Sequence, residues 1–262
     1  MQPLYDAIGV TYGATRHVDP FIAQALATYV GAKRGGLFLD LACGTGNYTC
    51  ALEAVGGQWH GIDISVQMLA QAMAKSRSVT WQCADACAIP YSGGSFAGVI
   101  CTLAIHHFPE LNTPFSEVFR VLRAGLFVLF TAFPEQMRNY WLCHYFPQMM
   151  ARSIEKMPSE ADIASALRGA GFAVQDAIPF HVTNELQDLF LYSGKDRPEI
   201  YLNPNVRSNI SSFATQCSSL ELESGLRMLR SDIESHRFHD VIRSYSVGAG
   251  EYAFVIAEKG IK

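Results

Sequence analysis

Short, largely apolar runs alternate with segments of helical periodicity between residues 37 and 133. The runs are typical of strands buried in a parallel sheet, and we predict strands at 37–41, 58–64, 79–84, 96–103 and 126–133. Apolar residues recur at helical spacing in the segments that begin at Asn47, Ser65 and Thr113, with Asn47 and Ser65 as candidate N-caps. This alternation predicts an α/β fold with a doubly wound, mostly parallel sheet.

The pattern continues on both sides of this region. Helices are expected at 20–30 and 159–169, a sixth strand ends near Val182, and a seventh, antiparallel strand covers 251–258. Roughly 65 residues separate the last two strands, too many for a structureless loop. Segments 186–192 and 220–237 have helical patterns, so we predict an inserted helical lid with Phe190, Tyr192 and Tyr201 as candidate pocket walls. The predicted division is an N-terminal helical flap (1–30), a core (31–183), the lid (184–248) and the last strand of the core (249–262).

A glycine turn follows the first strand. Gly44 and Gly46 allow positive φ and close approach of a ligand to the backbone. Asp63 ends the second strand, 19 residues after Gly44, about the offset at which a carboxylate meets a ribose diol. Thr49 stands where a dinucleotide fingerprint has its third glycine, and no G-K-[ST] follows. A nucleoside cofactor without phosphates therefore fits better than a dinucleotide.

The string LDLACGTG followed by GIDIS resembles the cofactor motifs of class I S-adenosylmethionine-dependent methyltransferases. The resemblance implies a Rossmann-like fold, with the Asp40–Gly46 loop at the methionine end of S-adenosyl-L-methionine, Asp63 at the ribose and Asp85 at the adenine. Met68 either borders the adenine or is an ordinary core methionine, and the glycine turn and Asp85 could be purely structural. The implied cofactor residues are Asp40, Ala42, Cys43, Gly44, Gly46, Asp63, Ile64, Met68, Ala84, Asp85, Ala86, Leu103 and Arg16.

Two adjacent histidines follow the fourth strand. The carboxyl ends of parallel strands line the ligand crevice, so His106 and His107 are the catalytic candidates. We expect His106 to contact the acceptor and His107 to support the next helix; alternatively, both only pack or cap. A histidine base would make turnover fall as the pH drops through a pKa near 6.5, if that pKa is unperturbed.

Aromatic residues in two segments are candidates for contact with the acceptor. Tyr5 and Tyr12 precede the first helix in YDAIGVTYGATRHVDP, a segment that in many small-molecule methyltransferases folds over the site. Trp141, His144 and Tyr145 lie in an aromatic-rich stretch, 137–150, that predicts a helical cover over a pocket. The alternatives are a surface helix for the first segment and a core-packing helix for the second.

Composition narrows the choice of partners and compartment. Charged residues make up 17% and hydrophobic residues 49%, as in a compact protein, and the net charge of -4 disfavours nucleic acid. No signal peptide is visible, and the most hydrophobic window, 124–133, is far short of the roughly 20 residues that span a bilayer. Seven cysteines without a C-x-x-C pair fit reduced thiols and no metal site. We expect a cytoplasmic protein.

These features predict methyl transfer from S-adenosylmethionine to a small-molecule acceptor, with no nucleic-acid or membrane partner. The segment order and the His-His pair are broadly similar to the ubiquinone and menaquinone biosynthesis methyltransferases. The alternative is a non-catalytic S-adenosylmethionine-binding or partner-binding protein that keeps the fold. The sequence carries no signal for the acceptor atom or for the oligomeric state.

Overall fold

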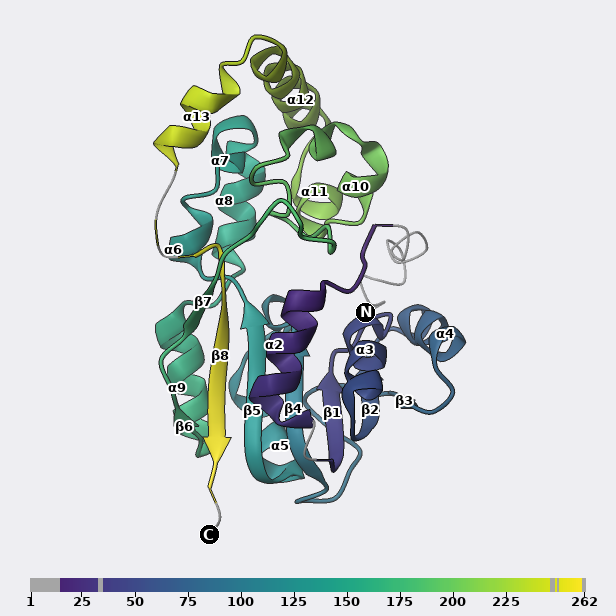
Figure 1. Ribbon diagram of the computed structural model, residues 1–262. Coiled ribbons are helices and arrows are strands. Elements are labelled where there is room, and N and C mark those ends of the chain that lie inside the picture. The colour runs from purple at the N-terminus through teal and green to yellow at the C-terminus, as the bar shows by residue number, and fades with distance from the viewer. Residues whose placement is uncertain (1–14, 33–34, 246–247, 249, 261–262) are drawn as a thin grey trace.

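A mixed sheet forms the centre of the computed structural model, which describes residues 15–32, 35–245, 248 and 250–260. The strand order is β3-β2-β1-β4-β5-β8-β6, with β7 also paired to β8. Strands β1 to β5 are mutually parallel, and β8 runs antiparallel to β5, β6 and β7 (Figure 1). The strands are β1 (Leu37–Leu41), β2 (Gln58–Asp63), β3 (Thr80–Cys83), β4 (Phe96–Thr102), β5 (Leu122–Thr131), β6 (Ala173–Val174), β7 (Ile178–Phe180) and β8 (Tyr252–Lys259).

The predicted doubly wound sheet is confirmed, with one difference in strand count. The predicted sixth strand is split into β6 and β7, which pair with opposite halves of β8. The chain order reverses between β1 and β4, which are neighbours in the sheet. Such a switch point is where ligands bind in open α/β sheets.

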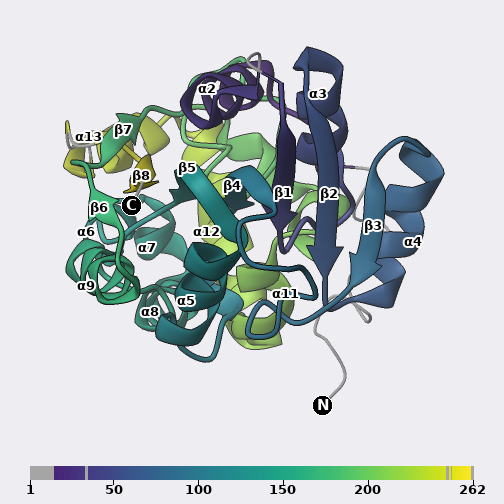
Figure 2. The same ribbon diagram turned by 90° about the horizontal axis from the view of Figure 1, so that it is seen from below.

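Helices cover both faces of the sheet. Helices α2 (Pro20–Val30) and α3 (Asn47–Val55) lie on one face, and α5 (Asn112–Val121) and α9 (Glu160–Ala170) lie on the other (Figure 2). Successive strand residues point to opposite faces, so Phe38 and Val128 join the cluster under α2 while Leu39 and Phe127 join the cluster under α5 and α9. The central strands β1, β4 and β5 are therefore largely buried on both sides, as their apolar runs predict, whereas the edge strand β3 is not.

One of the two predicted N-caps is confirmed and the other is wrong, and the structure adds a cap that was not predicted, Asp19 on α2. Ser65 Oγ accepts from the Met68 amide at the start of α4 (Val66–Lys75), and Asp19 caps α2. The prediction that Asn47 caps α3 is wrong, because Gly46 occupies that position with φ 69°. The Asn47 side chain instead donates to the Arg16 carbonyl at 2.7 Å.

Strand β5 begins four residues earlier than predicted, and Gly125 lies within it rather than ending a helix. The β4 and β5 register shifts between Phe96 and Gly98, opposite this glycine. A Cβ on Gly125, at φ 153°, would lie 2.1 Å from the Ala97 carbonyl oxygen. The glycine therefore permits a close strand contact.

The helical lid is built from two inserts. The first, between β5 and α9, holds α6 (Pro134–Met137), α7 (Leu142–Tyr145) and α8 (Pro147–Glu155). The second, between β7 and β8, holds η4 (Pro198–Leu202), α10 (Pro204–Ser208), α11 (Ser211–Gln216), α12 (Ser219–Glu234) and α13 (Phe238–Ser244). Helix α11 packs on α8 and α12 packs on α7, so the inserts form one layer beyond the carboxyl ends of the parallel strands (Figure 1).

The predicted helix at 220–237 is confirmed by α12, but the helix predicted at 186–192 is wrong. Backbone amides in that segment donate to other parts of the chain instead of to their own preceding turn. Gln187 donates to Asp19 Oδ2, Leu189 to the Thr15 carbonyl and Tyr192 to the Tyr252 hydroxyl. Tertiary hydrogen bonds replace the helical ones here.

Among the described residues, no helix combines the length and apolarity needed to cross a membrane.

Candidate functional site

The turn after β1 is tied to the end of β2 by Asp63. The Gly44 amide donates to Asp63 Oδ2 at 2.8 Å, and the Ser65 amide donates to Asp63 Oδ1 at 2.8 Å. One carboxylate thus holds two loops together at the end of β2.

Gly44 and Gly46 both have positive φ, 54° and 69°, but they face different surroundings. A Cβ on Gly44 would meet no atom within 4 Å, whereas one on Gly46 would lie 2.4 Å from the Trp81 ring. The Gly44 backbone therefore faces open space, and Gly46 is held against β3.

Asp40 lies on β1 beneath this turn and is almost fully buried. Its Oδ2 accepts a hydrogen bond from Thr49 Oγ1 at 2.5 Å. Burial raises the pKa of Asp40 to about 7, against the lowering effect of the Thr49 bond, and the nearby Asp63 carboxylate adds to the rise. The Asp40 carboxyl can therefore gain or lose a proton near neutral pH.

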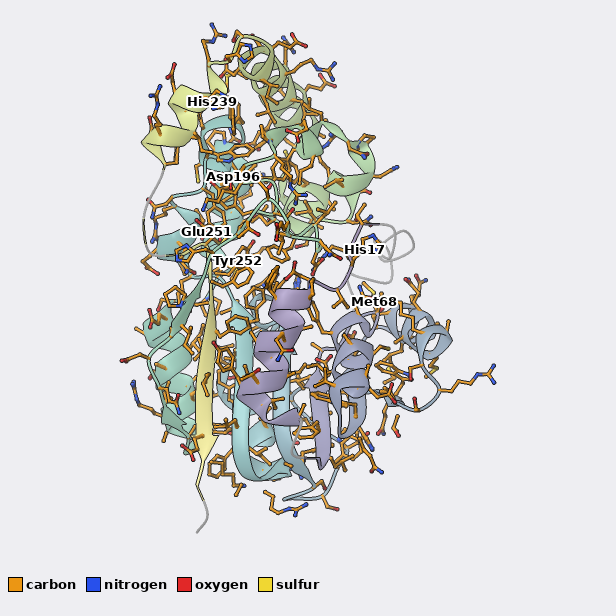
Figure 3. All side chains as sticks on the ribbon, viewed as in Figure 1. His17, Met68, Asp196, His239, Glu251 and Tyr252 are labelled. Carbon is orange, nitrogen blue, oxygen red and sulfur yellow. The ribbon has the colours of Figure 1, made fainter. Side chains whose placement is uncertain are left out.

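A cavity of about 440 Å³ opens where β1 to β4 end; we call it the loop cavity. Met68 on α4, labelled in Figure 3, contributes to its wall, as do Thr102 and Asp188. Thr102 Oγ1 is buried and has no hydrogen-bond partner among the described residues. The predicted cofactor residues that line this cavity are Arg16, Asp40, Ala42, Cys43, Gly44, Asp63, Ile64, Met68, Ala84, Asp85, Ala86 and Leu103.

Gly46 is the one predicted cofactor residue that does not line the loop cavity, because it packs against Trp81. Asp85 is a turn residue that also lines the loop cavity, so its role at the adenine stays a prediction. Its Oδ1 accepts from the Cys87 amide at 2.8 Å, as a turn aspartate does, and its side chain also lines the cavity.

Arg16 joins the core to the lid. Its guanidinium makes two bonds to the buried Asp188, from Nε to Oδ1 at 2.5 Å and from Nη2 to Oδ2 at 3.2 Å. Tyr48 on α3 donates to Asp188 Oδ2 at 3.1 Å. Arg16 also lines both this cavity and a second one.

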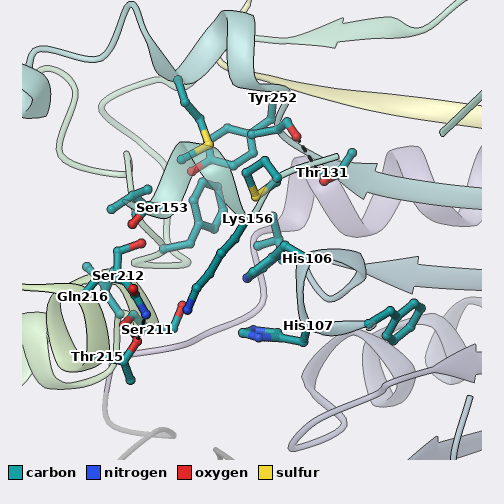
Figure 4. Close-up of a pocket in the computed structure, with 18 of the residues that line it drawn as sticks. His106, His107, Thr131, Ser153, Lys156, Ser211, Ser212, Thr215, Gln216 and Tyr252 are labelled. Atoms are coloured by element: carbon teal, nitrogen blue, oxygen red, sulfur yellow. Dashed lines mark hydrogen bonds between the residues drawn. The ribbon is translucent and has the colours of Figure 1, made fainter. Parts of the chain in front are cut away.

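The second cavity, of about 480 Å³, lies between the sheet and the lid; we call it the lid cavity. Figure 4 shows His106 and His107 side by side on one wall, with Ser211 and Ser212 of α11 across from them. The two cavities share Arg16, Leu103, His107 and Phe108.

The histidine rings lie 4.0 Å apart between centroids, on the 3₁₀ turn Ile105–His107. Burial and the neighbouring Lys156 cation lower the pKa of His107 to about 4. Burial, with a smaller effect of His107, holds the pKa of His106 well below its usual value. Both imidazoles are therefore neutral at physiological pH. His106 Nδ1 is buried without a hydrogen-bond partner among the described residues.

The position of His107 differs from the prediction that it mainly supports the next helix. Its side chain lines both cavities, whereas His106 lines only the lid cavity. The difference arises because the chain turns tightly after β4, with the His107 amide donating to the Ala104 carbonyl, instead of leading straight into α5.

The three predicted acceptor residues that the structure describes do not line the lid cavity. Trp141 and Tyr145 are buried inside the lid, where Trp141 Nε1 donates to the Lys195 carbonyl and Tyr145 donates to Asp232. His144 is exposed and lines neither cavity. The Trp141 and Tyr145 rings fill the core of the lid, as the alternative of a core-packing helix predicts. Tyr5 and Tyr12 lie outside the described residues.

The predicted pocket walls are divided in the same way. Phe190 lines the lid cavity, but Tyr192 and Tyr201 do not. Tyr192 stacks on Tyr140 with centroids 3.9 Å apart, and Tyr201 is fully buried.

Several residues of the lid cavity carry no signal in the sequence. The polar ones missed are Thr131, Ser153, Lys156, Ser211, Ser212, Thr215, Gln216 and Tyr252. They come from β5, α8, α11, β8 and the residues after α8, which the inserts bring together from distant parts of the chain. Tyr252, labelled in Figure 3, lies where β8 enters the sheet beneath the lid.

The described residues contain no group of three or more His, Cys, Asp or Glu side chains that could hold a metal ion. The chemistry of the site, as far as these residues go, rests on its carboxylates, histidines, hydroxyls and backbone amides.

Comparison with known proteins places this arrangement in a family. Residues 39–130 match a family model described as a methyltransferase domain. A solved structure from Anabaena variabilis, assigned as a methyltransferase of an antibiotic biosynthesis pathway, is 30% identical with a TM-score of 0.83. That match covers 94% of this chain and 99% of the other.

Curated relatives match over shorter segments. A malonyl-[acyl-carrier protein] O-methyltransferase of Erwinia billingiae is 32% identical over 46% of this chain and 48% of its own. A ubiquinone/menaquinone biosynthesis C-methyltransferase of Rhizobium johnstonii is 29% identical over 52% of this chain and 64% of its own. The chain thus spans about half to two thirds of the length of these curated relatives. The nearly complete match to the Anabaena structure, the methyltransferase domain and the loop after β1 together show that the chain belongs to the S-adenosylmethionine-dependent methyltransferases, whose cofactor is S-adenosyl-L-methionine.

Proposed function

We propose that this protein transfers the methyl group of S-adenosylmethionine, held in the loop cavity, to a small molecule held in the lid cavity. The observation that carries the proposal is the wall that the cavities share, formed by Arg16, Leu103, His107 and Phe108. Because these residues line both cavities, the cavities adjoin. A methyl donor in one and an acceptor in the other would lie within reach of each other at this border.

The loop cavity has the chemical groups that the cofactor needs. The Asp63 carboxylate lines the cavity and is of the type that accepts hydrogen bonds from ribose hydroxyls, and the open Gly44 backbone permits close approach of the methionine end. The cavity also has apolar walls, including Ile64 and Met68, suited to the adenine ring. Its volume, about 440 Å³, is within the usual range for small-molecule sites.

When bound, S-adenosylmethionine supplies an electrophilic sulfonium methyl, and the new bond to the acceptor forms as the bond to sulfur breaks. The protein's main contribution would be alignment of the acceptor with that methyl, which can supply about 7–11 kcal/mol in favourable cases. A positioned acceptor needs little further help from the side chains.

In this proposal the histidines contribute less to catalysis than a base with a pKa near neutrality would. His107, at the shared wall, would accept a hydrogen bond or a proton from the acceptor, but a pKa of about 4 makes it a weak base. His106 would contact the part of the acceptor farther from the cofactor, since it lines only the lid cavity.

The first test concerns cofactor binding. We expect Asp63→Ala to weaken S-adenosylhomocysteine binding about 10- to 150-fold, because hydrogen bonds to a carboxylate contribute about 1.5–3 kcal/mol. Isothermal titration measures this affinity. The exposed Asp176, which lines neither cavity, provides the matched control Asp176→Ala. Equal affinities for both variants would remove Asp63 from the cofactor site.

The second test concerns transfer. Incubation with S-adenosylmethionine labelled in the methyl group and a metabolite extract should give a labelled small molecule, identified by its mass shift. His107→Asn should slow that transfer by about 10²-fold or less, which is the lower end of the effect of proton-transfer catalysis. His106→Asn should slow the transfer by a smaller factor. Intact cofactor binding without any labelled product would favour the alternative, a non-catalytic S-adenosylmethionine-binding protein.

A further inference from the structure

The lid cavity has an uncompensated positive charge. Of the described residues that line it, the charged ones are Arg16 and Lys156, and none is Asp or Glu. The Arg16 charge is balanced by Asp188, which is almost fully buried beside it. No carboxylate in the described parts of the chain lies within ion-pair distance of Lys156.

Lys156 is not placed for a role in the cofactor site. It follows α8 in the lid and lines the lid cavity but not the loop cavity. In Figure 4 its side chain extends past His106 toward Ser211 and Ser212. It therefore brings an ammonium group into the space that we assign to the acceptor.

Neutral hydrogen-bonding residues line the same cavity as this exposed lysine. Ser211, Ser212, Thr215 and Gln216 line the same cavity from α11, and Ser153 does so from α8. Ser153 is buried, and its hydroxyl has no hydrogen-bond partner among the described residues. Buried polar groups usually have partners, so the unpaired Ser153 hydroxyl indicates a place for a polar ligand group in the cavity that Lys156 also lines.

The rest of the wall is apolar. The lining residues of this kind are Leu103, Phe108, Ala132, Met137, Met157, Phe190, Leu191 and Ile210. With about 480 Å³, the cavity has room for a molecule with a sizeable hydrophobic body.

Resting on the function proposed above, we infer that the acceptor is a monoanion, a carboxylic acid with an apolar body, whose carboxylate pairs with Lys156. A single lysine with neutral hydroxyls balances one negative charge. A phosphate monoester carries nearly two and is typically met by several cations or by arginine forks, and Arg16 is already paired with Asp188. A carboxylate is therefore the better match.

The experiment uses two acid and amide pairs of equal shape, 4-phenylbutyric acid with its amide and dodecanoic acid with its amide. Their binding to the full chain saturated with S-adenosylhomocysteine is measured by calorimetry. We expect the acids to bind about tenfold or more tightly than the amides, as for hydrogen bonds to charged groups. In Lys156→Gln the acid and the amide should bind about equally well. Lys156→Arg, which keeps the positive charge, should retain most of the preference for acids.

Two controls separate this inference from the proposed function. Arg77→Gln removes an exposed cation that lines neither cavity, so it should keep the full preference for acids. Affinity for S-adenosylhomocysteine should be the same in wild type and Lys156→Gln. A wild-type protein that does not bind S-adenosylhomocysteine would overturn the proposed function instead. Acids that do not bind, that bind no better than amides, or that keep their preference in Lys156→Gln would overturn the inference.

Discussion

Two glycines in one turn have separate roles at the scale of single residues. Gly44 faces the loop cavity with open space around its missing Cβ, while Gly46 touches Trp81. The sequence predicts positive φ for both, and the structure confirms it. It could not predict that a ring from β3 would fill the space beside Gly46, because Trp81 lies 35 residues farther along the chain.

This difference predicts opposite effects for two substitutions. Gly44→Val should abolish cofactor binding and lower the free energy of unfolding by only about 1–2 kcal/mol, the cost of a left-handed conformation for a residue with a side chain. Gly46→Ala should lower it by about 2–5 kcal/mol, because overpacking against Trp81 adds about 1–3 kcal/mol. The folded fraction of Gly46→Ala should bind S-adenosylhomocysteine normally. Urea denaturation and calorimetry measure both quantities, and a Gly44→Val variant with normal affinity would show that the loop is only a packing turn.

The histidines show the limit of residue type as a guide to protonation. A histidine after the fourth strand suggests a base that titrates near pH 6.5. The structure instead lowers the pKa of His107 to about 4, because the surrounding chain desolvates the ring and Lys156 lies nearby, although part of the side chain stays exposed. Both the lid and Lys156 come from segments whose position the local sequence does not determine.

At the scale of elements, the strands and helices of the core follow from periodicity, whereas the contacts of the lid do not. The core elements obey local rules: an apolar run, a cap and a glycine. The segment 186–192 has a helical pattern but bonds instead to Thr15, Asp19 and Tyr252. Its conformation depends on partners far away in the chain.

Arg16 and Asp188 form the main charged link between the segment before α2 and the lid. Arg16→Met should lower the free energy of unfolding by about 3–5 kcal/mol, because it leaves the buried Asp188 carboxylate without its cation. Asp188→Leu should destabilise less, and the double variant should be more stable than Arg16→Met alone. Denaturant unfolding of the four proteins without cofactor gives the coupling energy. Simple addition of the two losses would mean that the pair is not coupled.

At the scale of the whole molecule, the fold and the loop cavity could be predicted from the sequence, while the lid cavity could not. Much of the loop cavity is formed by residues at or just after the carboxyl ends of strands, so strand order brings Asp40, Asp63 and Asp85 together. The lid cavity needs two inserts to pack on each other, α8 against α11, before Lys156 and Ser211 share a space. The aromatic residues at 137–150 correctly predict that this segment belongs to the lid. Their largest rings, however, fill the core of the lid.

The two cavities together predict different pH responses for cofactor binding and turnover. Free Asp40 has a pKa of about 7, so below that pH it holds a proton. The methionine end of the cofactor carries an ammonium group, which by family resemblance lies at the Asp40–Gly46 loop. A cation there favours the ionised carboxyl, so the bound protein has a lower Asp40 pKa than the free protein. Affinity should therefore fall as the pH drops below about 7, approaching tenfold per unit until the lower pKa is reached.

Turnover at saturating cofactor should respond only at much lower pH. Neutral His107, with its pKa of about 4, keeps the same charge from pH 8 to about pH 5, so the maximal rate should stay nearly constant across that range. Asp40→Asn, which keeps an acceptor for the Thr49 hydroxyl, should make cofactor affinity independent of pH over the same interval. Calorimetry from pH 5 to 8 and initial rates with excess S-adenosylmethionine measure the two responses. A wild-type affinity that does not change with pH would place the ammonium away from Asp40, and a maximal rate that halves near pH 6.5 would show that a histidine with an ordinary pKa controls the rate.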